Sequence, residues 1–325
     1  MHKFYTTDCH CDSILNVARG QSPNMVNDYN TSKEGPFLQL FAIWTESGSG
    51  KVEKRCRDHY GLSELDNYEL ILKIIEDYHL CRRHENLSHC YNAATVKKAV
   101  EAGKNIAMLA IEGCGAIDSL EKLNEVYNLG TRFVTLTWNP DNCIAHGCDA
   151  SWTDRDTGLT DFGKEFVKEC GRLGIAVDLS HASNKTMTDV LELDCAPVFA
   201  SHSNFRAVCN HRRNLPDEVA LGICAKGGFI GLNTYLPFVK EGVGYPDYHA
   251  NELVRHAEYA DKLGIIDHLG FGFDLDGIDG YAVEIDGSRS IHDQYIKVFE
   301  DEGITGDRLE DIFGNNFLKF IERKF

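Results

Sequence analysis

The fold is decided by a short stretch that reads Phe4-Tyr5-Thr6-Thr7-Asp8-Cys9-His10-Cys11-Asp12. Its first part has the length and content of a buried strand, and its end carries a histidine and an aspartate. His10 and Asp12 are two residues apart, so on a strand their side chains point to the same side. An imidazole next to a carboxylate suits zinc or a similar divalent ion.

Three further apolar runs end in residues of the same kind. Glu112 follows the run 106–111, His181 follows the run 175–180, and His202 follows the run 197–201. Short apolar runs are typical of buried parallel strands. Enzymes built on an α/β barrel carry their active sites at the carboxyl ends of the strands. The pattern therefore predicts a metal site at one end of a barrel.

Eight apolar runs in all have the composition of strands. They lie near residues 4–9, 37–44, 105–111, 132–137, 174–180, 196–201, 228–234 and 268–273. Segments with helical signals separate most of them, and a strand followed by a helix, repeated eight times, favours a closed (β/α)8 TIM-like barrel. An open doubly wound sheet is the alternative, although no GxGxxG follows the first run. One domain is expected over residues 1–325.

Several connecting segments have recognisable signals. Ser63-Glu64-Leu65-Asp66 is a candidate capping box, and Thr160 is a candidate N-cap for the helix that follows it. We expect residues 45–104 to form an insertion with a short loop and two helices. Residues 138–160 have the composition of a long loop at the catalytic end of the fourth strand. Residues 304–320 have the apolar spacing of a C-terminal helix.

Composition excludes some classes of protein. The hydrophobic content is 43% over 325 residues, as in globular proteins, and the net charge of −17 argues against nucleic-acid binding. No apolar stretch approaches the roughly 18 residues of a membrane span, and no signal peptide is recognisable. The twelve cysteines include no CxxC pair, so we expect free thiols in a reducing cytoplasm. Cys9 and Cys11 are either thiolate ligands or small buried apolar residues.

The five candidate ligands exceed what one catalytic zinc ion normally uses. A site with two divalent ions accounts for all five if His10 and Asp12 hold one ion, His181 and His202 hold the other, and Glu112 bridges them. Ions about 3.5–4 Å apart acidify the water between them, which becomes a hydroxide nucleophile, and can polarise a carbonyl. Such a site has the chemistry for hydrolysing an amide.

Two more residues are candidates for contact with the substrate. Asp274 follows the eighth run, where a carboxylate can pass a proton to a leaving amine or hold a substrate ammonium; alternatively, it is a turn residue. Arg213 follows the sixth run, where an arginine can clamp a substrate carboxylate; alternatively, it is a solvated surface residue. His146, in the loop after the fourth run, is a further candidate for approach to the site.

These blocks resemble, in order and spacing, the membrane (renal) dipeptidase family of zinc peptidases. The resemblance extends over essentially the whole chain and rests on Asp8-Cys9-His10-Cys11-Asp12, Ile111-Glu112-Gly113, Val177-Asp178-Leu179-Ser180-His181, Ser201-His202-Ser203, Arg212-Arg213-Asn214-Leu215-Pro216-Asp217, Gly270-Phe271-Gly272-Phe273-Asp274-Leu275-Asp276-Gly277 and Gly314-Asn315-Asn316.

The resemblance implies a barrel of the amidohydrolase type with a binuclear zinc site. It implies the same five ligands, with Glu112 as the bridge. It implies that Arg213 clamps the C-terminal carboxylate of a dipeptide and that Asp274 lies near the substrate amine in a proton-transfer role. The family hydrolyses dipeptides, often with a D-residue at the C-terminal position, and a homodimer is a family-level expectation. Membrane attachment is not carried over.

The chain departs from the family at the end of the fourth strand. Many members have a histidine after Leu-Thr that contacts the substrate carbonyl, whereas here the run is Leu136-Thr137-Trp138-Asn139. An indole offers one N–H donor and cannot transfer a proton, so substrate choice and oxyanion stabilisation are expected to differ. Cys9 and Cys11 also replace the commoner glycine and asparagine around His10.

Three hypotheses about function follow. The first is a cytoplasmic zinc dipeptidase. The second is a related binuclear metal hydrolase of N-acyl amino acids or another small amide, which Trp138 motivates. The third is a metal-containing binding protein without catalysis, against which the presence of all five ligands and Asp274 argues.

Overall fold

A computed structural model describes residues 4–21, 25, 35–45, 51–63, 67–242, 250–278 and 291–325, with only the backbone described for 51–53. Within these residues, each of the eight runs expected to be a strand contains one. The strands are β1 (Thr6–Cys11), β2 (Phe37–Trp44), β4 (Ile106–Glu112), β5 (Thr131–Thr135), β6 (Ala176–Asp178), β7 (Val198–Phe199), β8 (Ile230–Leu232) and β9 (Leu269–Phe271). A two-residue strand, β3 (Ser88–His89), pairs with β4 and was not predicted.

The eight predicted strands are all parallel and follow one another around a ring. One sheet has the order β1-β2-β4-β5-β6-β7, and β8 pairs with β9. Two short parallel bridges join these sheets: Ala200 pairs with Ile230, and Cys11 pairs with Leu275. The (β/α)8 barrel is therefore confirmed, and the open doubly wound alternative is wrong, because an open sheet would leave its first and last strands unpaired.

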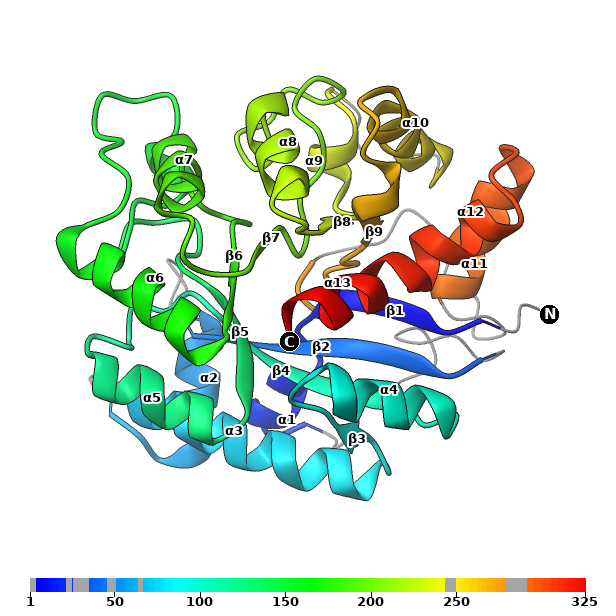
Figure 1. The fold of residues 1–325 in the computed structure, drawn as a ribbon. Helices are drawn as coiled ribbons and strands as arrows, with labels where there is room; N and C mark the ends of the chain where they lie inside the picture. Colours follow the sequence, from blue (N-terminus) through cyan, green and yellow to red (C-terminus); the bar gives the residue numbers. More distant parts are fainter. Residues whose placement is uncertain are drawn as a thin grey trace.

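Both faces of the strands are buried. On β2, Phe37, Phe41 and Ile43 belong to the large apolar cluster shared with the helices, whereas Leu38 and Leu40 belong to a second cluster. This alternation is the period-two pattern of a strand covered on both sides. Figure 1 shows the helices arranged around the strands, with the C-terminal helix close to β1.

The helices fill the connections between the strands. They are α1 (Ile14–Ala18), α2 (Lys51–Tyr60), α3 (Asn67–His84), α4 (Ala93–Glu101), α5 (Leu120–Asn128), α6 (Asp161–Leu173), α7 (Asn184–Leu193), α8 (Asp217–Ala225), α9 (Leu236–Val239), α10 (Val254–Lys262), α11 (Ile291–Asp301), α12 (Asp307–Glu310) and α13 (Asn316–Lys324), with short helical turns η1 (Cys148–Ala150), η2 (Ala250–Leu253), η3 (Ile266–His268) and η4 (Asp311–Asn315).

The structure confirms only some of the helix signals in the sequence. Thr160 caps α6 as expected, since its hydroxyl accepts a hydrogen bond from the Gly163 amide at 2.9 Å. The candidate capping box at 63–66 lies mostly outside the described residues, and α3 begins at Asn67. The described residues of the segment 45–104 contain three helices, α2, α3 and α4, where two were expected.

The C-terminal helix differs from the expected span of 304–320. The chain forms α12, then the π-helical turn η4, and then α13, which continues to Lys324. The π turn contains Gly314, whose missing side chain lets the backbone approach the carbonyl of Tyr5 at the start of β1. The interruption of the regular helix therefore coincides with the close approach of this segment to the barrel.

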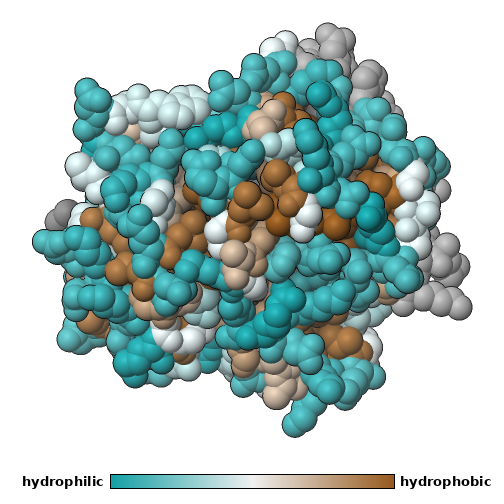
Figure 2. Space-filling model, turned by 45° about the horizontal axis from the view of Figure 1, so that its top comes forward, coloured by the Kyte–Doolittle hydropathy of each residue, from teal (hydrophilic) through white to brown (hydrophobic). Residues whose placement is uncertain are grey.

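Most of the surface in Figure 2 is hydrophilic, with hydrophobic residues gathered near the centre of that face. The acidic composition is consistent with this, since 50 acidic residues oppose 33 basic ones. Among the helices of the described residues, none has both the length and the apolar character needed to cross a bilayer.

Candidate metal centre and substrate pocket

The five predicted ligands converge at the carboxyl ends of four strands. His10 lies in β1 and Asp12 just after it, Glu112 ends β4, and His181 and His202 lie three residues beyond β6 and β7. All five side chains are buried. The barrel thus brings together residues that are up to 192 positions apart, because every strand delivers its end to the same rim.

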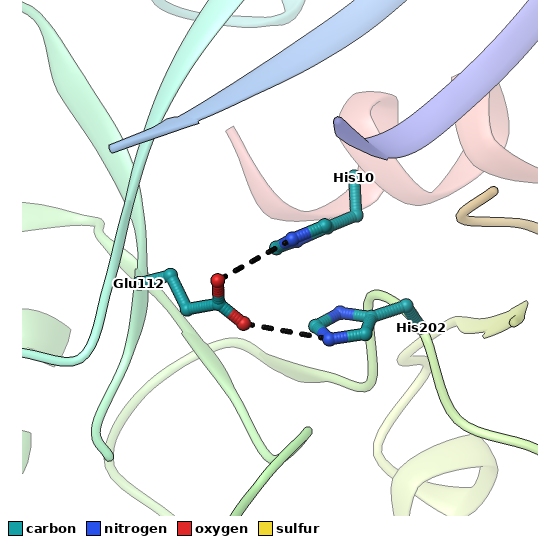
Figure 3. Close-up of side chains that lie close together, drawn as sticks. All are labelled: His10, Glu112 and His202. Atoms are coloured by element: carbon teal, nitrogen blue, oxygen red, sulfur yellow. Dashed lines mark ion pairs between the residues drawn. The ribbon is translucent and has the colours of Figure 1, made fainter. Parts of the chain in front are cut away.

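Glu112 lies at the centre of this group. Its Oε2 atom is 3.6 Å from Nε2 of His10, and its Oε1 atom is 3.0 Å from Nε2 of His181 and 3.4 Å from Nε2 of His202. Figure 3 shows the carboxylate of Glu112 between His10 and His202, with one oxygen directed to each ring. The two oxygens therefore face different histidines, as a bridging carboxylate requires.

The remaining distances complete two overlapping groups of donor atoms. Nε2 of His10 is 3.5 Å from Oδ2 of Asp12 and 3.9 Å from Oδ1 of Asp274. Nε2 of His181 is 2.9 Å from Nε2 of His202. Donor atoms of His10, Glu112 and His202, and separately of His10, Asp12 and Asp274, all lie within 4.8 Å of one another.

The donor set fits divalent cations. Nε2 of His10 and Oδ1 of Asp12 are buried and have no hydrogen-bond partner. A buried lone pair or charge without a partner is unfavourable, and a bound cation would satisfy it. Three imidazoles and two carboxylates are also the nitrogen and oxygen ligands found at catalytic zinc sites.

Charges in the group set the protonation of the candidate ligands. Burial by itself would raise the pKa of Glu112, but His10 and His181 outweigh it and hold that pKa well below its usual range. Burial and the positive charge of Arg213 lower the pKa of His181 to about 4. Near neutral pH, Glu112 is therefore anionic and His181 is neutral, which are the states that bind a metal.

His10 differs from the other two histidines. Burial would lower its pKa, but the carboxylates of Glu112 and Asp12 raise it well above the ordinary value. The same negative charge that stabilises a proton on His10 would stabilise a metal cation at that position.

A second layer of polar groups orients the histidines. Nδ1 of His202 lies 2.6 Å from Oγ of Ser201, and Ser201 donates to Oδ2 of Asp178 at 2.5 Å. Ser201 therefore accepts from Nδ1–H of His202, which leaves the Nε2 lone pair facing the pocket. Nδ1 of His181 lies 2.8 Å from Oδ1 of Asn139, with the same consequence.

Asp8, in β1, connects this strand to the segment that follows β9. Its Oδ1 atom accepts hydrogen bonds from the amides of His10 at 3.1 Å and Phe273 at 3.0 Å, and its Oδ2 atom accepts one from Gln39 at 2.9 Å. Burial raises the pKa of Asp8 to about 7, against these hydrogen bonds. Asp8 thus links β1 to the backbone just before Asp274.

Asp274 lies at the edge of the candidate metal centre. Its backbone is in the left-handed region, with φ of 62°, and Oδ2 accepts from Nδ2 of Asn233 at 3.0 Å. His181 has a similar φ of 63°. Non-glycine residues in this region are strained, and such residues concentrate at functional sites. Burial raises the pKa of Asp274, although the charge of His10 and the Asn233 hydrogen bond oppose the rise.

Arg213 is a buried cation, with 2% of its surface exposed. Nη2 donates to the carbonyl of His202 at 3.3 Å and Nη1 donates to Oγ of Ser203 at 3.4 Å, while Nε has no partner. Its guanidinium lies over the ring of Phe238 at 5.3 Å. Among the ion pairs of the described residues, Arg212 is matched with Asp149, whereas none includes Arg213. The surface alternative for Arg213 is therefore wrong.

Asp12, Glu112, His181 and Asp274 line a cavity of about 450 Å³, whereas Arg213 lies behind it, under the ring of Phe238. The cavity is lined by Asp12, Leu15, Arg19, Trp44, Glu112, Trp138, Asn139, His181, Tyr235, Phe238, Asp274, Asp276, Gly277 and Ile278. The cavity is large enough for a small organic molecule, and it combines acidic groups with several aromatic rings.

Three further candidates, His146, Cys9 and Cys11, have other surroundings. His146 does not line the cavity; its ring lies 3.6 Å from Asp141 and 3.2 Å from Thr157. Burial raises the pKa of Cys9 and of Cys11 well above the usual value, and Cys9 donates to the carbonyls of Ser201 and Phe271. Both thiols are buried, and neither belongs to the groups of donor atoms gathered around His10.

Sequence reasoning missed the residues that support the ligands. Asp8 and Asp178 are charged residues inside apolar runs, and this was the available signal. Ser201, Asn139 and Trp44 carry no comparable signal, because their roles depend on neighbours from other strands.

Comparison with known proteins gives a consistent result. A model of the family described as membrane dipeptidase (Peptidase family M19) matches residues 1–324. Two uncharacterized dipeptidases of Schizosaccharomyces pombe are 33% identical over 219 residues and 35% identical over 217 residues. These matches cover 67% and 66% of this chain, and the chain spans about half the length (52%) of each of these curated relatives.

Solved structures with the same fold include a metallopeptidase from Rhodobacter sphaeroides, liganded with a phosphinate mimic of the dipeptide L-Ala-D-Ala. It is 24% identical, with a TM-score of 0.80 and coverage of 100% of both chains. The probable dipeptidase PvdM from Pseudomonas aeruginosa is 20% identical, with a TM-score of 0.75 and coverage of 99% of this chain and 96% of that chain.

Proposed function

Because the chain belongs to the membrane dipeptidase family, Peptidase family M19, we propose that it is a zinc-dependent dipeptidase with two metal ions. The observation that carries this proposal is the position of Glu112, whose two carboxylate oxygens face different histidines. A carboxylate that serves only one ion has no need for this arrangement.

The candidate ligands divide between two ions. His10 and Asp12 would hold one ion, His181 and His202 the other, and Glu112 would bridge them. Two ions held by these residues would supply a nucleophilic hydroxide from bound water and Lewis-acid polarisation of the scissile carbonyl. Zinc is the favoured metal, since three of the five ligands are imidazoles.

Arg213 and Asp274 would bind the two ends of the substrate. The buried guanidinium of Arg213, which lacks a carboxylate partner among the described ion pairs, suits the C-terminal carboxylate of a dipeptide. Asp274 lies beside His10 at the pocket wall, where its carboxyl group would hold the substrate amine and pass a proton to the departing amine. The phosphinate mimic of L-Ala-D-Ala bound by the Rhodobacter sphaeroides relative supports a D-residue at the C-terminal position.

Metal content and hydrolysis test this proposal together. The purified full chain, loaded with zinc, should contain about two metal ions by elemental analysis and should cleave L-Xaa-D-Ala or L-Xaa-L-Ala in a chelator-sensitive manner. Glu112→Gln should lose at least one ion and lower kcat/KM by about 10³-fold or more, because it removes the bridge.

Glu165→Gln is the matched control, since Glu165 is an exposed residue of α6 that pairs with the exposed Lys168. Its metal content and activity should equal those of the unaltered protein. Little or no metal after zinc loading would disprove the binuclear site.

The second candidate is a metal-dependent hydrolase of N-acyl amino acids or another small amide. Trp138 favours it, because an indole lines the pocket where many relatives have a histidine. An N-acetylated dipeptide separates the two functions. A dipeptidase requires the free amine and should refuse this compound, whereas an amide hydrolase of the second kind should cleave it.

We also propose the cytoplasm as the compartment, one domain over residues 1–325 and a homodimer as the assembly. The twelve cysteines all lie in described residues and no disulfide joins any two of them, which supports a reducing compartment. The homodimer rests on the family alone, and the molar mass in solution tests it.

A further inference from the structure

The pocket has an aromatic wall made of Trp44 and Trp138. Trp44 is the last residue of β2, and Trp138 lies three residues beyond the end of β5. Their ring centroids are 5.0 Å apart, with the planes tilted by 60°. The two indoles come from the strands on either side of β4, which ends at Glu112, and their rings meet over the end of that strand.

The aromatic wall reaches the candidate metal centre. Trp44 is the register partner of Glu112, and the ring of Trp138 is 6.1 Å from the ring of His181, at an interplanar angle of 33°. Both indoles line the cavity that also contains Asp12 and Glu112. A group bound at the metal centre therefore lies next to these rings.

The groups proposed to bind the ends of the substrate belong to the other half of the rim. Arg213 follows β7 and Asp274 follows β9, and Tyr235 and Phe238 follow β8. The aromatic wall lies at the ends of β2 and β5, on either side of β4. Arg213, Tyr235 and Asp274 follow β7, β8 and β9, which lie on the other side of the ring. A dipeptide held at Arg213 and Asp274 would project a side chain across the pocket towards Trp44 and Trp138.

We propose that Trp44 and Trp138 form a subsite for an aromatic or large apolar side chain of the substrate. This inference rests on the proposed dipeptidase function and narrows its substrate class. Indole faces bind aromatic rings through offset or tilted stacking and through loss of apolar surface from water. We expect a preference of about tenfold or more in kcat/KM over a dipeptide with only methyl side chains.

A positively charged residue of the same cavity supports a different preference. Arg19 also lines the cavity; its Nη1 atom donates to Asn16 at 3.4 Å, and its Nε atom has no partner. An arginine in this position would favour an acidic side chain. We favour the apolar one because two large rings, rather than one partly satisfied cation, form the wall next to the metal centre.

The test compares substrates on the zinc-loaded full chain. L-Ala-D-Ala, L-Phe-D-Ala, L-Ala-D-Phe and L-Ala-D-Glu are measured with the unaltered protein and with Trp44→Ala, Trp138→Ala and Trp138→Phe. At least one of the two Phe-containing dipeptides should exceed L-Ala-D-Ala by about tenfold in kcat/KM. The alanine variants should lose most of this ratio, mainly through a higher KM, and Trp138→Phe should keep it.

Trp152→Ala is the matched control. Trp152 is 58% exposed and does not line the cavity, so its removal should leave the ratio unchanged. Metal content of each variant shows that the site still forms, and the Trp138→Phe variant tests the ring even if an alanine variant fails to fold.

The possible results separate the two levels of the argument. Two bound metals with no cleavage of any dipeptide would reject the proposed dipeptidase function. The aromatic subsite would be overturned if the ratio of kcat/KM between the Phe-containing dipeptides and L-Ala-D-Ala stayed the same after loss of either indole. It would also be overturned if L-Ala-D-Glu were the best substrate. Either result would leave the dipeptidase function in place.

Discussion

Single residues that never reach the pocket decide which way the candidate ligands face. Asp178 accepts hydrogen bonds from the amides of Ser180 and Ser201 and from the hydroxyls of Ser201 and Thr135. Ser201 in turn is bonded to Nδ1 of His202. One buried carboxylate thus fixes the tautomer of a histidine on the neighbouring strand and the backbone on both sides of it.

Replacing Asp178 should therefore weaken metal binding without removing a ligand. In Asp178→Asn, an amide group faces donors that need an acceptor, so Ser201 loses its anchor and His202 its orientation. We expect metal affinity to fall by about 10–100-fold and the free energy of unfolding to fall by about 1–3 kcal/mol. Competition with a fluorescent zinc chelator measures the affinity, and denaturant titration of the metal-free protein measures the stability.

Asp267→Asn provides the comparison for this prediction. Asp267 is exposed in η3, far along the chain from the ligands, and its replacement should change neither quantity. An Asp178→Asn protein with unaltered zinc affinity would show that His202 is oriented by its own packing rather than by Ser201.

At the level of elements, the connections after the strands are held together by buried polar side chains. His256 of α10 accepts a hydrogen bond from the Phe205 amide at Nδ1, at 3.2 Å, and Nε2–H donates to the carbonyl of Val239 at 3.0 Å. It therefore ties α10 to the segment after β7 and to the end of α9. Both contacts require the neutral ring, because a protonated Nδ1 cannot accept.

This arrangement predicts a loss of stability in acid. Burial lowers the pKa of His256 to about 4 in the folded chain, whereas an unfolded histidine titrates near 6.5. Since the unfolded chain binds the proton more readily, the contribution is complete above about pH 6.5 and is lost as the pH falls towards 4. The loss should approach about 3 kcal/mol.

The measurement is the pH dependence of urea unfolding for metal-free protein. His256→Gln, which keeps a donor for Val239 but cannot be protonated, should show a shallower slope between pH 6.5 and 4 than the unaltered chain. His84→Gln, at an exposed histidine at the end of α3, should keep the full slope. Equal slopes for His256→Gln and the unaltered chain would mean that His256 does not drive the acid sensitivity.

For the whole molecule, the barrel concentrates negative charge at one rim. Asp12 and Glu112 are buried there and Asp274 is partly buried beside them, and the chain as a whole has a net charge of −17. Carboxylates so close together repel one another in a medium of low dielectric constant. Divalent cations would relieve this repulsion, so the folded state and metal binding are linked.

Metal removal should therefore destabilise the entire fold. Treatment with a chelator should lower the thermal midpoint, and added zinc should restore it; each site at a free metal concentration of 100 times its Kd contributes about 2.7 kcal/mol. Differential scanning calorimetry with parallel elemental analysis measures the effect. Chelator that was saturated with zinc beforehand should have no effect, and an unchanged midpoint in protein stripped of metal would contradict the linkage.

Local pattern in the chain determined the eight strands, the cap at Thr160 and the family to which the chain belongs. These features depend on residues close together in the sequence: an apolar run of six to eight residues, a hydroxyl before a helix, and a polar residue at the end of a strand. The sequence also predicted which seven side chains to examine at the rim. Their roles as ligands, clamp and proton carrier remain proposals.

Only the tertiary structure decided the remaining features. The ring closes through single bridges at Ala200 and Cys11, the last helix is interrupted where Gly314 meets β1, and Trp44 meets Trp138 although they are 94 residues apart. The hydrogen bonds that Ser201, just after β7, donates to Asp178 are also tertiary contacts of this kind. Each of these contacts joins segments that are far apart in the sequence and share no periodic pattern. Which segments meet therefore depends on how the barrel closes and on which strands become neighbours.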